Sequence, residues 1–101
     1  MMYSIETTDV FDKWFASKVK DVKSRARIIS RFDRIQMGNL GDYRLLDENL
    51  YELRFLFGPG FRVYFTIRNQ TIVFLLCGGD KSSQARDIQK AKQIMEDQPW
   101  V

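Results

Sequence analysis

The residues best suited to chemistry in this chain of 101 residues are two arginines and a lysine. Arg54 closes the run Leu-Tyr-Glu-Leu-Arg, and Arg62 lies just after the turn Gly-Pro-Gly. Lys81 follows the segment Gly-Gly-Asp. Guanidinium groups offer paired N–H donors to a phosphate, and two of them on adjacent strands repel each other unless an anion lies between them. The sequence therefore predicts an anion-binding site with these three cations.

The residue types limit the chemistry that such a site could perform on RNA. Metal-free cleavage needs a base for the 2'-hydroxyl proton, cations for the phosphorane and an acid near the leaving 5'-oxygen. The chain has no histidine, so lysine, tyrosine and carboxylates remain. We expect Lys81 to act as the base, because neighbouring arginines disfavour its protonated form. Tyr64 would stack on a nucleobase or donate its hydroxyl.

Hydrophobic periodicity predicts a small sheet that positions these side chains. Alternation over residues 51–57 and 61–68 predicts two strands, with Gly-Pro-Gly as the turn between them. Asn69-Gln70 predicts the next tight hairpin. Residues 71–77 are apolar on both faces, with Cys77 on the same face as Val73 and Leu75, which is typical of a central strand. Residues 3–7 predict an opening strand.

Three segments have the spacing of amphipathic helices. Thr8 is expected to cap the first, and Ser82 or Ser83 to cap the last. Residues 21–37 predict the longest helix, which Gly38 ends. The apolar residues that set its spacing are Val22, Ala26, Ile29 and Phe32, with Ile28 and Ile35 widening the stripe. The last helix has Ile88, Ala91 and Met95 on one side.

These elements predict an α+β fold in the order β-α-α-β-β-β-α, forming one domain over residues 1–101. Both N-terminal helices should pack on the aromatic face of the sheet, because an exposed layer of phenylalanines would aggregate. The opposite face is then expected to display Arg54, Arg62 and Tyr64 to solvent.

Composition excludes several classes of protein. The 16 basic and 13 acidic residues give a formal charge of +3, which is compatible with a nucleic-acid partner. The single cysteine, Cys77, excludes a disulfide within the chain. No apolar run is long enough to span a bilayer, and the ligand count excludes zinc. We therefore expect a cytoplasmic protein with no cofactor, no metal and no membrane association.

The motifs resemble those of a known superfamily. Glu-Leu-Arg before Gly-Pro-Gly-Phe-Arg-Val-Tyr, and Gly-Gly-Asp-Lys-Ser-Ser-Gln before Asp-Ile-Gln-Lys-Ala-Lys, are similar to the RelE/ParE toxins. Within them the chain resembles the HigB-like group, often described as addiction module killer proteins. This resemblance implies the toxin of a type II toxin–antitoxin system with a helix-turn-helix antitoxin. Many members cut mRNA in the ribosome, whereas the ParE branch poisons DNA gyrase.

The resemblance also assigns residues by position. Arg62 matches the arginine after the hairpin, Arg54 a basic position on the preceding strand, and Lys81 the basic position after the last strand. These are the expected catalytic residues. The residues expected to contact substrate, on the resemblance or on their place in the predicted elements, are Tyr64, Arg68, Gln84, Lys23, Arg27 and Arg31.

Other interpretations stay open. The last segment lacks the tyrosine or histidine of some family nucleases and offers Gln84, Arg86 and Asp87 instead. A gyrase inhibitor, or a degenerate member that only binds its antitoxin, therefore remains an alternative to a nuclease. Arg62 could form an exposed ion pair with Glu52. The basic row along the longest helix could be a solvated face rather than a surface that docks on ribosomal RNA phosphates.

Overall fold

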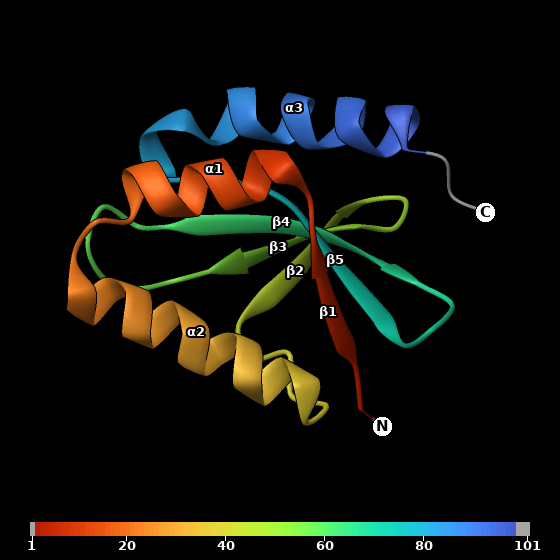
Figure 1. Ribbon diagram of the computed structural model, residues 1–101. Helices are drawn as coiled ribbons and strands as arrows, with labels where there is room; N and C mark the ends of the chain where they lie inside the picture. The colour runs from red at the N-terminus through yellow and green to blue at the C-terminus, as the bar shows by residue number, and fades with distance from the viewer. Residues whose placement is uncertain (1, 99–101) are drawn as a thin grey trace.

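The computed structural model describes residues 2–98. It contains a five-stranded sheet in the order β1-β5-β4-β3-β2, in which β1 and β5 are parallel and the other neighbours antiparallel (Figure 1). In chain order the elements are β1 (Ser4–Thr7), α1 (Asp9–Lys18), α2 (Val22–Gln36), β2 (Tyr43–Asp47), β3 (Leu50–Arg54), β4 (Arg62–Arg68), β5 (Ile72–Gly79), the 3-10 helix η1 (Lys81–Ser83) and α3 (Gln84–Asp97). Among these residues no helix has the length and apolar content needed to cross a bilayer.

The predicted α+β class is confirmed, with one strand more than expected. The sequence analysis missed β2, which pairs with β3 at the edge of the sheet. β2 is short and largely exposed, and the alternation of Tyr43, Arg44 and Leu45 is broken at Leu46, where the register shifts between Leu45 and Asp47. β3 is shorter than predicted and ends at Arg54.

Local signals explain where most elements begin and turn. Thr8 caps α1 as predicted, because its side chain accepts the N–H of Phe11. Asn69 and Gln70 both have positive φ, as a tight hairpin of this kind requires. Ser83 occupies the N-cap position of the last helix, as predicted, but its side chain makes no cap hydrogen bond to α3. Asp80 caps the preceding η1 by accepting the N–H of Ser82, and η1 leads directly into α3.

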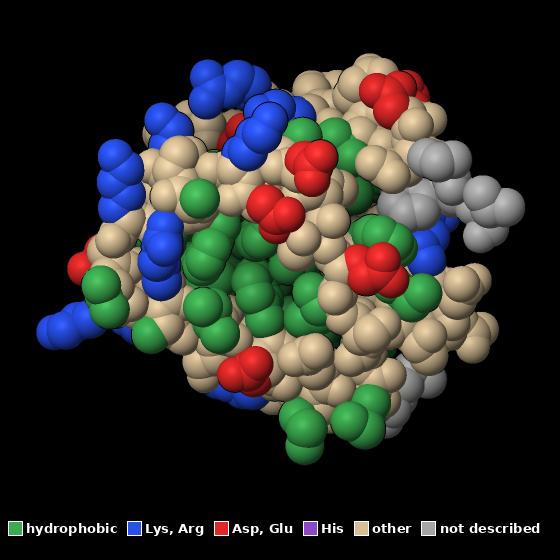
Figure 2. Space-filling view, viewed as in Figure 1, with side chains coloured by type: hydrophobic (Ala, Val, Ile, Leu, Met, Phe, Trp, Pro, Cys, Tyr) green, Lys and Arg blue, Asp and Glu red, His purple; other side chains and the backbone are tan. Residues whose placement is uncertain are grey.

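Helices cover both faces of the sheet. One core lies between the sheet and the pair α1 and α2, and contains Phe11, Ile28, Leu53 and Phe65, so the predicted packing of the two N-terminal helices on the aromatic face is confirmed. Figure 2 shows hydrophobic side chains gathered between α1 and α2. A second core lies under α3. Its buried members are Leu50, Tyr64, Leu76, Cys77 and Ala91.

The second core corrects the expectation of an open polar face. We predicted that Arg54, Arg62 and Tyr64 would be displayed to solvent. In the structure α3 packs over β4 and β5, so Tyr64 is 0% exposed and Arg62 is 9% exposed. The residues on the apolar side of α3 were predicted correctly, but the packing of α3 on the Tyr64 face of the sheet was not predicted.

The apolar stripe of α2 is offset from the one predicted. Val22 is 79% exposed and Ile29 is 46% exposed, whereas Ile28 and Ile35 are fully buried and Phe32 packs beside them. The doublet Ile28-Ile29 allows two helical phases that differ by one residue. The observed phase buries three large side chains at spacings of four and three residues, which the hydrophobic effect favours.

A bulge in β5 changes the face of Cys77. Tyr64 pairs with Cys77 and Phe65 with Leu75, so Leu76 is an extra residue on this strand. Leu76 and Cys77 consequently both belong to the core under α3, although alternation had placed Cys77 with Val73 and Leu75. Burial, reinforced by the charge of Asp87, raises the pKa of the Cys77 thiol to about 12.

Gly78 allows α1 to approach the end of β5, and this contact gives a first prediction. A Cβ at Gly78 would lie 2.3 Å from Cε3 of Trp14. We expect Gly78→Ala to lower the free energy of unfolding by about 3 kcal/mol, the upper range for an overpacked core. In a Trp14→Leu background the same change should cost at least about 1 kcal/mol less, because the contact is gone. Urea denaturation of the four proteins measures both values, and equal costs in the two backgrounds would contradict the explanation.

Candidate functional site

The predicted cations meet at one end of the β3–β4 hairpin. Arg54 and Arg62 are register partners on antiparallel strands, so both side chains leave the same face of the sheet. Lys81 reaches this place from η1. A Cβ on Gly60 would lie 3.2 Å from Cβ of Lys81 and 3.6 Å from Nη1 of Arg62. Lys81 and Arg62 therefore lie close together at Gly60, and Arg54 lies opposite Arg62 on the neighbouring strand. We call these three residues the hairpin cluster.

Arg62 is the most constrained member of the hairpin cluster. Its Nη1 donates to the carbonyl oxygens of Gly60, at 3.1 Å, and Phe61, at 3.4 Å. Its Nε lies 3.9 Å from Oε2 of Glu52. The ion pair with Glu52 that the sequence left open is thus present, but it is buried rather than exposed. Burial makes this pair far more sensitive to loss of one partner than a surface pair.

Glu52 is the acid around which this face is organised. Its side chain is 0% exposed, and Nε2 of Gln84 donates to its Oε2 at 2.7 Å. Nε of Arg44 lies 3.8 Å from its Oε1. A buried carboxylate is tolerated only with such partners. Gln84, expected to contact substrate, therefore has its amide directed into the protein and connects α3 to β3.

Tyr64 does not face an open surface. It is the register partner of Glu52 and belongs to the core that also contains Ala91 of α3 and has Ile88 packed against it. Its buried hydroxyl has no hydrogen-bond partner among the described residues. Burial, followed by the charge of Glu52, raises the pKa of the Tyr64 hydroxyl. The expectation that this tyrosine stacks on a nucleobase is not met with α3 in this position.

The other two cations of the hairpin cluster are more accessible. The side chain of Arg54 is 40% exposed, and its Nη2 lies 3.2 Å from Oδ1 of Asp42. Lys81 is exposed and has no ion-pair partner within residues 2–98. An incoming anion would therefore meet Lys81 and Arg54 first, with Arg62 held behind them.

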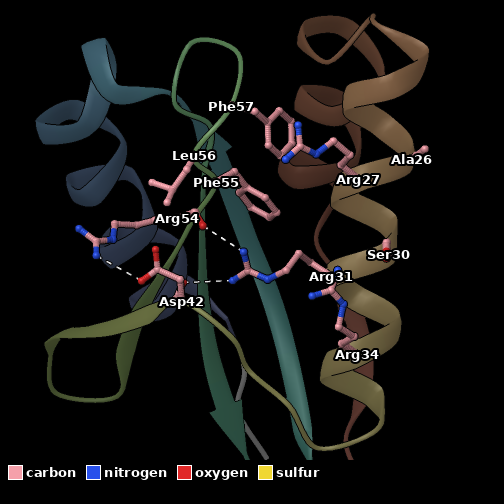
Figure 3. A pocket seen from close by; sticks show the side chains of 10 residues that line it. All are labelled: Ala26, Arg27, Ser30, Arg31, Arg34, Asp42, Arg54, Phe55, Leu56 and Phe57. Atoms are coloured by element: carbon pink, nitrogen blue, oxygen red, sulfur yellow. Dashed lines mark hydrogen bonds and ion pairs between the residues drawn. The ribbon is translucent and has the colours of Figure 1, made fainter.

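A second group of arginines lines a pocket between α2 and β3, which we call the arginine pocket (Figure 3). The pocket has a volume of about 420 Å³, and its charged residues are Arg27, Arg31, Arg34, Arg54 and Asp42. This excess of positive charge in a concave surface attracts anions. Figure 3 shows the guanidinium of Arg54 and the carboxylate of Asp42 directed away from α2, so the positive side chains inside the pocket are Arg27, Arg31 and Arg34.

Arg31 anchors α2 to the sheet. Its guanidinium donates to the carbonyl oxygens of Arg54, at 3.0 Å, Asp42, at 3.1 Å, and Leu40, at 3.3 Å, as Figure 3 shows in part. It also lies 4.8 Å from the centroid of the Phe55 ring. Burial lowers the pKa of Arg31, while the charge of Asp42 opposes this shift. The structure thus gives Arg31 a packing role that a solvated basic face would not require.

The remaining predicted contact residues are placed differently. Arg27 lies over the Phe57 ring, 4.0 Å from its centroid, at the mouth of the arginine pocket. Lys23 is exposed and does not line that pocket. Arg68 is at the far end of β4, six residues from Arg62 and hence about 20 Å away along the strand. The structure does not bring Lys23 or Arg68 to the hairpin cluster.

Sequence reasoning missed two charged residues of this region. Asp42 precedes β2 and pairs with Arg54, and Arg44 on β2 lies beside Glu52. Both depend on the strand that the sequence analysis did not predict. Glu52 itself had a usable signal, because alternation placed it on the same face as Arg54.

Residues 14–96 match the protein family described as Phage derived protein Gp49-like (DUF891). The chain belongs to this family. The Gp49-like family is part of the RelE/HigB-like toxin–antitoxin superfamily, which confirms the resemblance in its motifs at the level of the superfamily. The match covers the hairpin cluster and the arginine pocket.

A curated relative extends the comparison across almost the whole Gp49-like chain. A protein of Haemophilus influenzae is 43% identical over 97 residues, covering 96% of this chain and 97% of the relative. That relative is described as an uncharacterized protein. No solved structure matches the chain.

The buried carboxylate gives the second prediction. Glu52→Gln keeps the shape and the hydrogen bond to Gln84 but removes the charge that compensates Arg62. We expect it to lower the free energy of unfolding by about 3 kcal/mol, as for a broken buried pair. Glu48→Gln, in the exposed turn before β3, is the matched control and should change stability by less than about 0.5 kcal/mol. Equal urea midpoints for the two variants would show that Glu52 does not have this role.

Proposed function

We propose that this protein is the toxin of a type II toxin–antitoxin system, of the HigB-like group, and that it arrests translation by cutting mRNA on the ribosome. Family membership supports a toxin. The observation that carries the nuclease assignment is the hairpin cluster, in which Lys81 lies close to Arg62 and Arg54 lies opposite Arg62 on the neighbouring strand. Cations fixed in advance around one position suit the charge that develops on a phosphorane.

In this proposal Arg54, Arg62 and Lys81 have different roles because their side chains differ in exposure. Arg54 can approach the non-bridging phosphate oxygens, and Arg62 supports it from the protein side, so that Lys81 is left for proton transfer. The 2'-oxygen attacks the phosphorus and the bond to the 5'-oxygen breaks, giving a 2',3'-cyclic phosphate and a 5'-hydroxyl. In this scheme Lys81 takes the 2'-hydroxyl proton, and a proton from solvent or the ribosome reaches the 5'-oxygen. Tyr64 has no part in the reaction, because it is buried with a raised pKa.

The ribosome supplies orientation in this proposal. A site without histidine has weak acid–base groups at neutral pH, so positioning of the 2'-hydroxyl must contribute a large share of the acceleration. The arginine pocket, with Arg27 and Arg34, would contact phosphates of ribosomal RNA. We further propose a helix-turn-helix antitoxin as the partner that controls the toxin in the cytoplasm.

A second candidate function is inhibition without cleavage. The burial of Glu52 beside Arg62 and the burial of Tyr64 withhold a carboxylate and a phenol from proton transfer to a substrate. These observations favour a member that binds gyrase or its antitoxin alone. Gyrase supercoiling measured beside transcript integrity separates this candidate from the nuclease.

The third prediction tests cleavage directly in a reconstituted translation system with mapped transcript ends. Lys81→Ala should slow cleavage at least about 100-fold, the usual contribution of an acid–base group, without changing the unfolding midpoint, because Lys81 is exposed. Lys13→Ala, an exposed lysine of α1, is the matched control and should cut at the parent rate. Intact transcripts with the parent protein, or equal rates for both variants, would overturn the nuclease assignment.

A further inference from the structure

A second groove lies on the other side of η1 from the hairpin cluster. It has a volume of about 790 Å³, which is within the range of ligand pockets, and none of its residues was expected to contact substrate. Its walls are the end of α1, the start of α2, the turn at Gly58 and Pro59, and the start of α3. Trp14 and Phe61 provide its aromatic lining.

The acids of this groove are already engaged within the protein. Asp21 caps α2 and accepts both the N–H and the hydroxyl of Ser24, each at 3.0 Å. Asp80 caps η1 through Ser82, and Asp87 accepts the hydroxyl of Ser83 while being only 5% exposed. In each of these acids one carboxylate oxygen is engaged by a serine of the protein.

The cations of the groove are not engaged in this way. The basic residues that line it are Lys18, Lys20, Arg86 and Lys90. All are exposed, and within residues 2–98 none has an ion pair with an acid. Figure 2 shows Lys and Arg side chains gathered on the side of the molecule where α1 ends and where α2 and α3 begin. The groove therefore combines acids that are hydrogen-bonded within the protein with exposed basic side chains that have no ion pair within residues 2–98.

Trp14 adds an apolar ring to this positive groove. Its benzene ring lies against Gly78, where a Cβ would approach Cζ3 to 2.4 Å, and it meets Phe61 edge-on at 6.1 Å between centroids. These contacts fix the indole, while its intermediate exposure leaves part of it facing the groove. A fixed aromatic ring beside free cations is the combination that binds single-stranded nucleic acid, through base stacking and phosphate contacts.

The groove adjoins the hairpin cluster. Asp80 and Ser82 line the groove, and Lys81 lies between them in the chain with its side chain against Gly60. The turn at Gly58 and Pro59 likewise forms a wall of the groove, while Gly60 contacts Lys81 and Arg62. An RNA strand with one phosphate at the hairpin cluster would reach the groove with an adjacent nucleotide.

We infer that this groove is a subsite for a single-stranded nucleotide next to the linkage held by the hairpin cluster. The base stacks on Trp14, and Lys18, Lys90 and their basic neighbours contact the phosphates. The inference rests on the proposed function for the identity of the strand as RNA. It adds to that function a binding site on the α1 side of η1.

The fourth prediction uses the fluorescence of Trp14 in the isolated full chain. Trp100→Phe leaves Trp14 as the sole tryptophan, and hexa-adenylate RNA is the probe. We expect saturable quenching by the RNA, with much weaker quenching by adenosine, which lacks the phosphate. In the same background, Lys18→Ala with Lys90→Ala should weaken binding at least tenfold. Loss of two phosphate contacts should also reduce the slope of log K against log salt by about 1.4.

The matched control is Lys13→Ala with Lys92→Ala, which removes two lysines outside the groove. It should bind within about twofold of the parent. Equal losses in the two double variants, or no saturable quenching, would overturn the subsite. Quenching by poly-glutamate as strong as that by the RNA would overturn it in favour of an acidic protein segment. The fluorescence titration contains no ribosome, so its outcome does not depend on cleavage. Intact transcripts in the translation system would refute cleavage but would leave the binding of RNA to the groove unaffected.

Discussion

The burial of one carboxylate between the sheet and α3 is the constraint on which this face of the molecule depends. Glu52 lies at the centre of a β-strand surface where Arg44, Arg62 and Gln84 converge on it. Without the acid, α3 would cover an uncompensated guanidinium, which is among the most costly arrangements in a protein. With it, α3 can pack over β4 and β5, and Arg62 is held close to the surface in a fixed position.

That arrangement explains why the cations differ in accessibility although they share one end of the hairpin. Arg62 is bound to backbone and carboxylate oxygens, Arg54 has a half-exposed partner, and Lys81 has none within residues 2–98. Because Arg62 and Arg54 each face an acid and Lys81 faces none among the described residues, the uncompensated positive charge of the cluster lies at its exposed lysine. The same principle operates in the groove beyond η1, where serine hydroxyls and helix caps engage the acids and leave the lysines free.

The sequence predicted those features that depend on local pattern. Alternation placed Arg54 and Arg62 on one face, and they are register partners. It could not predict that α3 covers this face, because the apolar side of a helix does not specify which layer it joins. β2 was missed because it is short and exposed and its bulge breaks the alternation after Leu45, and with it the partners Asp42 and Arg44 were missed. Only the three-dimensional structure could show that Lys23 and Arg68 lie away from the hairpin cluster.

The irregular edge of the sheet has a consequence for the behaviour of the protein in solution. β2 leaves one side of its backbone without a strand partner, which is the geometry that lets sheets of different molecules join. The register shift after Leu45 and the charges of Arg44 and Asp47 interrupt that edge. A neighbouring molecule would meet a kinked, charged strand only five residues long, so the edge resists polymerisation even though Tyr43 and Leu45 are exposed on it.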